Sequence, residues 1–223
     1  FYGIACNSDV RLMILNSTGK NFSAGADLAW MKKMASYSHE KNLSDAKVLS
    51  EMFKSLHEMP QPTIVRIQGA AMGGALGLIS CCVIALAEAD SSFALSEVKL
   101  GLIPATISPY VVPAIGPRAA RRYFVTGERF SAHKAKELGL VSEVLDREEL
   151  DCCLENMVAA LLANSPQATK KAKALVSLVE SRALDRDLIE ETCELIADMR
   201  VSDQGQEGLS AFLEKRKPNW LSR

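Results

Sequence analysis

The sequence lacks the features that would place the protein in a membrane or on nucleic acid. No run of about 18 apolar residues occurs, so we predict no membrane-spanning helix. The chain has no basic excess either, because 26 Lys and Arg residues stand against 27 Asp and Glu residues and the formal net charge is -1. Since a surface that binds a polyanion normally carries a basic excess, we expect neither nucleic acid nor a membrane among its partners.

Metal-binding and disulfide patterns are also missing. The three histidines, His39, His57 and His133, lie far apart in the sequence, and no CxxC pair exists, so we predict no metal site. Four of the six cysteines form two adjacent pairs inside apolar runs, Cys81–Cys82 and Cys152–Cys153. Adjacent cysteines are poorly placed for bridging. We therefore expect reduced, mostly buried thiols in a cytoplasmic protein.

The common catalytic signatures do not occur. The chain has no GxSxG elbow, no P-loop and no HExxH motif. A glycine-rich stretch around Gly73 follows a strand-like run, and Asp90 comes about 20 residues later, as in a dinucleotide-binding unit. The glycines do not form GxGxxG, however, and helices rather than further βα units follow. The dinucleotide interpretation therefore fails on spacing.

The composition and the hydrophobic pattern predict a folded α/β chain. The 223 residues are 48% hydrophobic and 24% charged, which is ordinary for a globular protein. Periodicity and turn residues predict strands at 10–16, 63–68, 83–87, 93–96 and 141–145. They predict helices at 27–35 and 40–59, and an apolar helix that ends at Cys82. Further helices are predicted at 131–138, 147–163, 167–182, 186–200 and 205–215. We expect a core at 1–140 and a helical region at 141–223.

Two predicted strand–helix junctions consist of glycine and alanine. In Phe22–Leu28 (FSAGADL), Asp27 begins a helix, and the amides just before it are unpaired donors. In Gln68–Leu78 (QGAAMGGALGL), Gly74 lies where the main chain can approach a ligand and aim an N–H outward. Each junction alone also fits an ordinary turn. Together they supply two convergent donors, which is what an oxyanion hole requires.

A third segment carries an acid. In Phe93–Pro104 (FALSEVKLGLIP), Glu97 lies between apolar residues at the end of a predicted strand. Desolvation there would raise its pKa toward the range that is useful for proton transfer. Taken alone, the segment also fits a surface carboxylate on an edge strand.

In this order, the three segments resemble the crotonase (enoyl-CoA hydratase/isomerase) superfamily. Residues 118–144 (RAARRYFVTGERFSAHKAKELGLVSEV) and 207–220 (EGLSAFLEKRKPNW) are similar to the family's stretch after the active site and to its closing helix. The resemblance covers nearly the whole chain. It implies an α/β fold with a ββα spiral core and a helical C-terminal trimerisation region. Family members usually carry further N-terminal strands, so we expect that these strands are missing from this sequence.

The resemblance also implies roles for individual residues. The oxyanion donors would be the backbone N–H groups of Ala26 and Gly74, and Glu97 matches the family's retained catalytic glutamate. Coenzyme A would enter as part of the substrate, with no separate cofactor. The positions that match the CoA site, the last two of them reaching a neighbouring copy, are Lys20, Ala24, Asp27, Leu28, Phe212 and Lys215.

Two positions depart from the family pattern. Hydratases with two glutamates have Glu where this chain has Gly77, and a lysine often follows GADL where this chain has Ala29.

Leu95–Val112 is similar to bacterial methylglutaconyl-CoA hydratases and their relatives, which act on branched, carboxylated enoyl-CoAs. We therefore predict hydration of such an α,β-unsaturated acyl-CoA through a stabilised enolate, in a homotrimer or a dimer of trimers. The alternatives are an enoyl-CoA double-bond isomerase and a non-catalytic homologue that binds CoA esters or RNA.

Overall fold

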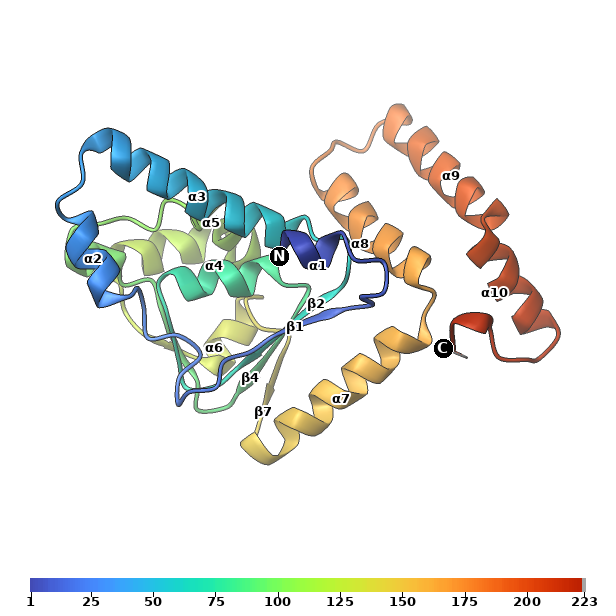
Figure 1. The fold of residues 1–223 in the computed structure, drawn as a ribbon, viewed down its shortest axis with the longest axis horizontal. Helices are drawn as coiled ribbons and strands as arrows, with labels where there is room; N and C mark the ends of the chain where they lie inside the picture. The colour runs from blue at the N-terminus through green and yellow to red at the C-terminus, as the bar shows by residue number, and fades with distance from the viewer. Residues whose placement is uncertain (222–223) are drawn as a thin grey trace.

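The computed structural model describes residues 1–221 and contains two small β-sheets with helices packed around them (Figure 1). The four-stranded sheet is parallel throughout and has the order β1 (Met13–Leu15), β2 (Thr63–Ile67), β4 (Ile84–Glu88) and β7 (Glu143–Leu145). The three-stranded sheet has the order β3 (Ala70–Met72), β5 (Ser92–Ala94) and β6 (Phe130–Ser131). In this second sheet β3 and β5 are parallel, whereas β5 and β6 are antiparallel. The predicted α/β class is confirmed.

Most of the helices follow the predicted spans, but no span was predicted for the helices Tyr2–Ala5 and Ser108–Thr126. The first half contains α1 (Tyr2–Ala5), α2 (Leu28–Met34), α3 (His39–His57), α4 (Gly74–Cys81), the 3₁₀ turn η1 (Glu97–Leu100) and α5 (Ser108–Thr126). The second half contains α6 (Ala132–Glu137), α7 (Arg147–Ala163), α8 (Pro166–Glu180), α9 (Arg186–Val201), α10 (Asp203–Leu213) and the 3₁₀ turn η2 (Asn219–Leu221). Side-chain caps explain many of the helix starts, because Ser and Asp oxygens accept from free first-turn amides. The capping residues are Asp27, Ser38, Ser131, Ser165, Asp185 and Ser202.

The four-stranded sheet is buried on both faces. Val65 of β2 belongs to the large core cluster that also contains Phe53 of α3 and Leu76 of α4. The neighbouring Ile64 points to the other face and packs with Leu150 of α7. This alternation is the period of two that a β-strand imposes on its side chains. Since helices cover both faces, β2 is apolar along most of its length, as parallel strands are.

Several local predictions were wrong. The strands β3 and β6 were not predicted, and Glu97 does not end a strand but opens η1, three residues after β5 ends. The thiols are not mostly buried, although all six are free. Cys81 alone is buried, whereas the exposed thiols are those of Cys6, Cys152 and Cys193. Adjacent residues on a helix point about 100° apart, so only one cysteine of the pair on α7 can face the sheet.

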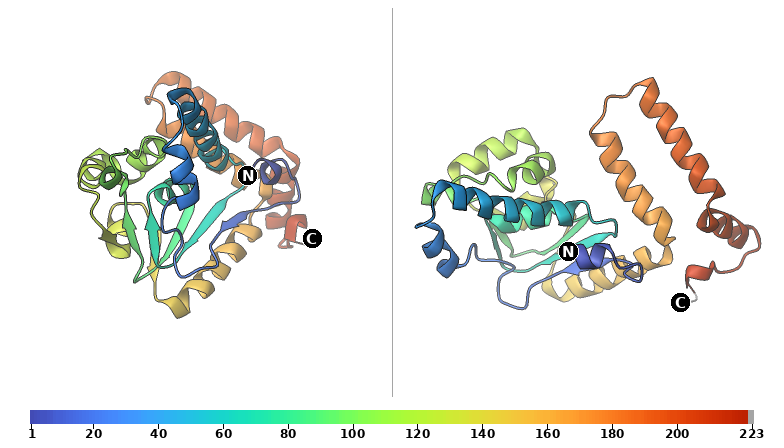
Figure 2. Two further views of the ribbon diagram at one scale, coloured as in Figure 1. Left: turned by 60° about the vertical axis from the view of Figure 1, so that its left-hand side comes forward. Right: turned by 45° about the horizontal axis from the view of Figure 1, so that its top comes forward.

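The last three helices extend away from the sheets. Figure 1 and the right-hand view of Figure 2 show α9 and α10 standing apart from the strands, with α8 between them and the core. The side chain of Lys173 anchors α8, since its Nζ donates to the carbonyls of Met59 (2.6 Å) and Gln61 (3.3 Å). The division at residue 140 stays a prediction; β7 and α7, which lie beyond it, pack on the four-stranded sheet. Within residues 1–221, no helix is both long and apolar enough to span a bilayer.

Candidate active site

Three short parallel segments bring the chemistry-bearing residues to one edge. Ser23 forms a parallel bridge with Ala71 of β3, and Ala71 is in register with Phe93 of β5. Two hydrogen bonds hold the first pairing, from the Ser23 amide to the Ala70 carbonyl and from the Met72 amide to the Ser23 carbonyl, each 3.0 Å. Parallel segments end on the same side. The next few residues of each segment therefore emerge close together.

The candidate oxyanion donors occupy the same position in two of these segments, three residues after the paired residue. Ala26 lies three residues after Ser23, and Gly74 lies three residues after Ala71. Gly74 is the first residue of α4, so its amide has no partner within the helix. In the described part of the chain, no acceptor hydrogen-bonds with the amide of Ala26 or of Gly74. Two unpaired amides on adjacent parallel ends are suited to hold one carbonyl oxygen.

The carboxyl group of Glu97 lies against the second donor segment. A Cβ at position 73 would be 3.2 Å from Oε1 of Glu97, so this carboxyl group touches the backbone directly before Gly74. Gly73 has φ 59° and ψ −122°, a conformation that residues with side chains rarely adopt. A glycine at position 73 therefore serves both the turn into α4 and the close approach of the acid.

Glu97 has the environment of a proton-transfer group. The side chain is half-buried, and its Oε2 atom is buried without a hydrogen-bond partner among residues 1–221. Burial raises the pKa of Glu97 above its ordinary value, and a hydrogen bond from its own backbone amide offsets this only in part. A carboxyl group with a raised pKa that lies directly before an unpaired amide can exchange a proton next to a carbonyl which that amide polarises.

Position 77 has no room for a second acid. Gly77 is buried in α4, and a Cβ there would lie 2.4 Å from Cγ2 of Ile107 and 2.8 Å from Cε1 of Phe53. Apolar side chains thus fill the space in front of this glycine. Sequence reasoning noted the missing glutamate but did not identify Ile107 and Phe53. No local pattern links these residues to position 77.

The candidate CoA-binding residues fall into two groups. Four of them, Lys20, Ala24, Asp27 and Leu28, are exposed and flank Ala26 in the chain. The carboxylate of Asp27 caps α2, because its Oδ1 accepts from the Trp30 amide at 2.7 Å. The other two, Phe212 and Lys215, lie at the far end of the molecule from α2 in Figure 1 and are exposed. A single chain therefore does not bring the two groups together.

Comparisons with known proteins find relatives that match nearly the whole chain. The family model described as Enoyl-CoA hydratase/isomerase matches residues 3–223. The solved structure of an enoyl-CoA hydratase from Shewanella pealeana is 51% identical, with a TM-score of 0.94 over 98% of this chain and 82% of that one. An enoyl-CoA hydratase structure from Mycobacterium smegmatis is 32% identical, with a TM-score of 0.91 over 99% and 84%. The crotonyl-CoA hydratase of Syntrophomonas wolfei is 31% identical over 98% of this chain and 84% of its own length.

Replacing Glu97 tests the desolvation of its carboxyl group. A carboxyl whose folded pKa is raised adds stability below its ordinary pKa of 4.5, and this stability is lost as the pH rises through the raised value. We expect Glu97→Gln to become more stable relative to the wild type as the pH increases from about 4 to about 8. Urea unfolding across this range measures the difference in free energy.

Glu40 provides a control of opposite sign. Hydrogen bonds from its own backbone amide and from Ser38 lower its pKa, so Glu40→Gln should lose stability relative to the wild type as the pH rises. A difference for Glu97→Gln that is flat with pH, or that follows the sign of Glu40→Gln, would show that the Glu97 carboxyl is not desolvated.

Installing the missing acid tests the packing at position 77. We expect Gly77→Glu to lower the free energy of unfolding by more than about 3 kcal/mol, since the side chain overpacks Ile107 and Phe53 and buries a charge. The matched control is Gly3→Glu, because a Cβ there meets nothing within 4 Å. This control should stay within about 0.5 kcal/mol of the wild type in urea denaturation. Wild-type stability of Gly77→Glu would contradict the packing described above.

Proposed function

Because the chain belongs to the enoyl-CoA hydratase/isomerase family, we propose that Ala26, Gly74 and Glu97 form its active site. The fold is the crotonase fold, with parallel sheets and C-terminal helices. The family acts on acyl-CoA thioesters as enoyl-CoA hydratases or isomerases, and hydration, a hydro-lyase reaction, is the activity that we propose first for this chain. The observation that carries the site assignment is the carboxyl group of Glu97, which has one buried, unpartnered oxygen and whose other oxygen lies against Gly73, directly before the unpaired amide of Gly74.

The two amides stabilise the charge that develops during hydration. As water adds to the β-carbon, the electrons of the carbon–carbon double bond move toward the thioester, and negative charge grows on its oxygen. The N–H groups of Ala26 and Gly74 would donate to this oxygen. This stabilisation is greatest in the enolate, because the two N–H groups already point at the thioester oxygen before its charge develops. Losing one such donor typically costs about 3–4 kcal/mol of transition-state stabilisation.

Glu97 completes the reaction by moving one proton. In its ionised form the carboxylate holds a water molecule and accepts a proton from it while the water oxygen bonds to the β-carbon. The same carboxyl then returns that proton to the α-carbon, where the enolate electrons form the new C–H bond. The raised pKa favours the first step, since it makes the carboxylate a stronger base toward the water. A positioned acid or base of this kind contributes roughly 100- to 10,000-fold.

The substrate that fits a single-acid site is a branched or carboxylated enoyl-CoA, such as methylglutaconyl-CoA. Position 77 carries no acid, and Ile107 and Phe53 occupy its surroundings. Glu97 must therefore both hold the water and relay its proton, unless a carboxylate of the substrate helps. The similarity of Leu95–Val112 to hydratases of this substrate class supports the same choice.

The lone acid also favours a second candidate, an enoyl-CoA double-bond isomerase. Shifting a double bond requires one group that removes a proton and returns it at another carbon, and no positioned water. A non-catalytic CoA-ester binder is less well supported, because a buried, unpartnered carboxyl oxygen lowers stability without serving binding.

A substrate panel separates these candidates. We expect the wild type to hydrate 2-enoyl-CoAs, with the highest kcat/KM for methylglutaconyl-CoA, and Glu97→Gln to lose turnover by at least about 100-fold while still binding the CoA ester. Absorbance of the conjugated thioester follows hydration, and product analysis detects isomerisation of 3-enoyl-CoAs. Isomerisation without hydration would replace our first candidate by the second, and near-normal turnover of Glu97→Gln would refute the catalytic assignment.

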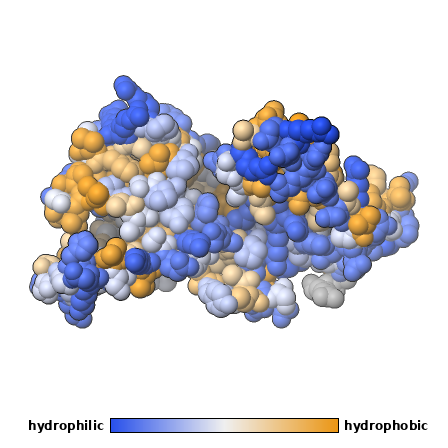
Figure 3. Space-filling view, turned by 90° about the horizontal axis from the view of Figure 1, so that it is seen from above, coloured by the Kyte–Doolittle hydropathy of each residue, from blue (hydrophilic) through white to orange (hydrophobic). Residues whose placement is uncertain are grey.

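We also propose that the chain works as a homotrimer or a dimer of trimers. Leu184, Ile196 and Phe212 are exposed on the C-terminal helices and the turn before them, and Phe212 keeps 81% of its accessible surface. Figure 3 shows apolar side chains at this end of the molecule, on the right of the view. Large apolar side chains gathered at one end of a molecule favour an interaction with another protein surface. A second copy would also bring Phe212 and Lys215 to a site that a single chain leaves incomplete.

Sedimentation equilibrium tests the assembly. We expect the mass of a trimer or hexamer of the 24.2 kDa chain, and a higher KM for the CoA ester in Phe212→Ala. A monomer with wild-type KM in that variant would argue against both the assembly and the shared site.

A further inference from the structure

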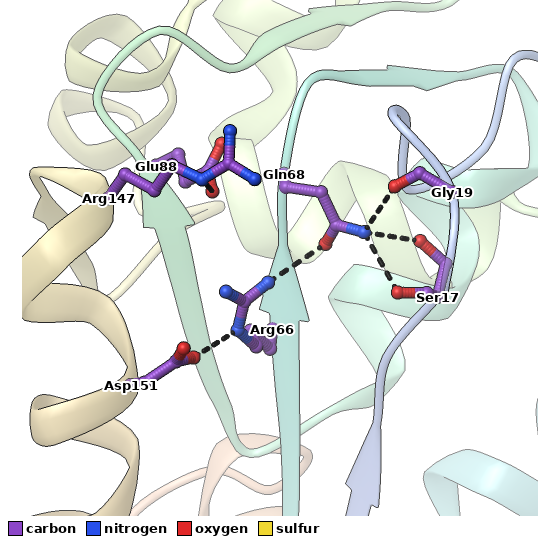
Figure 4. A network of polar contacts seen from close by, with 7 residues as sticks. All are labelled: Ser17, Gly19, Arg66, Gln68, Glu88, Arg147 and Asp151. Atoms are coloured by element: carbon purple, nitrogen blue, oxygen red, sulfur yellow. Dashed lines mark hydrogen bonds and ion pairs between the residues drawn. The ribbon is translucent and has the colours of Figure 1, made fainter.

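The side chain of Gln68 joins β2 to the loop that carries Lys20. Gln68 directly follows the last residue of β2 and is buried, with 8% of its surface exposed. Its Nε2 atom donates to the carbonyl of Ser17 (2.9 Å), to Oγ of Ser17 (2.8 Å) and to the carbonyl of Gly19 (3.0 Å). Figure 4 shows this amide pointing into the loop, with its nitrogen facing all three acceptors.

A second set of contacts determines the orientation of the amide. Oε1 of Gln68 accepts from Nη1 of Arg66 at 3.2 Å, and Nε of Arg66 forms a 2.7 Å ion pair with Oδ1 of Asp151 on α7. The oxygen of Gln68 therefore faces a cation, and its nitrogen faces carbonyls. Figure 4 places the separate ion pair between Glu88 and Arg147 beside this chain of contacts. The amide of Gln68 is thus held from the side of β2 and α7.

The loop at residues 17–21 depends on such hydrogen bonds. Its sequence, Ser-Thr-Gly-Lys-Asn, contains no large apolar side chain that could anchor it by packing. Within the loop, Oγ of Ser17 donates to the Asn21 carbonyl at 3.0 Å, and Oδ1 of Asn21 accepts from the Ala70 amide at 3.0 Å. Gly69 has φ 59°, and a Cβ there would lie 2.4 Å from the Lys20 carbonyl. The loop backbone therefore lies directly on the segment between β2 and β3.

We propose that Gln68 is a positioning residue for the nucleotide part of the CoA ester. By holding the carbonyls of Ser17 and Gly19, it pre-organises the loop that presents Lys20 and leads into the Ala26 amide. Pre-organisation of a binding loop raises affinity, because less conformational entropy is lost when the ligand binds. Gln68 itself does not touch the substrate. The inference rests on the proposed CoA-ester function and adds the residue that keeps the nucleotide end of the site in place.

The chain provides a matched control at the other end of β2. Gln61 is also buried, and its Nε2 also donates to three backbone carbonyls, those of Ile4, Ala5 and Asn7, each at 3.3 Å. Those carbonyls belong to the N-terminal segment, which has no part in the proposed site. Gln61→Leu and Gln68→Leu therefore remove the same kind of contact, and only the second loosens the loop at residues 17–21.

Calorimetric binding of two saturated thioesters tests the proposal. Butyryl-CoA contains the nucleotide, S-butyryl-pantetheine lacks it, and neither can be hydrated. We expect Gln68→Leu to raise the Kd for butyryl-CoA about tenfold and to change the Kd for S-butyryl-pantetheine by less than about twofold. Gln61→Leu should leave both Kd values within about twofold of the wild type, even if the protein is less stable.

Three outcomes decide the matter. An unchanged Kd for butyryl-CoA in Gln68→Leu, or an equal loss for both thioesters, would overturn the positioning role while leaving the proposed function intact. A wild type that binds no butyryl-CoA would instead refute the function on which the role rests. Should Gln68→Leu fail to fold, Ser17→Ala replaces it. That variant removes one acceptor of Gln68 from the loop side and should raise the Kd for butyryl-CoA alone about threefold.

Discussion

The parallel register of three short segments is the constraint on which the rest of the site depends. Ser23 pairs with Ala71, and Ala71 pairs with Phe93, so stretches far apart in the sequence end at one edge. The two amide donors and the acid then follow within four residues of these pairs. A slip of one residue in either pairing would turn the following backbone to the opposite face. In the proposed site, backbone pairing therefore sets the positions of the donors before any side chain contributes.

The chemistry at that edge depends equally on two positions that have no side chain because they are glycines. Gly73 leaves the space in which the carboxyl group of Glu97 approaches the backbone, and Gly77 leaves the space that Ile107 and Phe53 fill. The first absence lets the acid lie directly before the proposed donor Gly74, and the second leaves the proposed site with one acid. Burial of Glu97 raises its pKa and leaves one oxygen unpartnered. The fold thus gives up some stability at neutral pH where reactivity is required, as functional sites commonly do.

Binding and catalysis are linked through β2. Its carboxyl end leads into Gln68, which holds the loop of Lys20, and then into β3, which ends two residues before the proposed donor Gly74. Its two faces pack on α3 and α7, so the strand is among the most buried parts of the chain. A rigid strand that supports both a loop and a donor keeps their separation constant. Phe212 and Lys215 lie far from this strand within one chain, so their proposed contribution to the site depends on the proposed assembly.

The sequence by itself determined most of the helices, the α/β class, the family resemblance and the three chemistry-bearing segments. These follow from hydrophobic periodicity, capping residues and short motifs, all of which act over a few neighbouring positions. Only the tertiary structure decided that Ala70–Met72 forms a strand, that Glu97 opens a 3₁₀ turn, and that Gln68 holds a loop some fifty positions earlier in the chain. Those features depend on partners distant in sequence, and a pairing or a buried contact between distant residues leaves no local pattern. The same reason explains why the missing glutamate at position 77 was visible in the sequence, whereas the side chains that occupy its place were not.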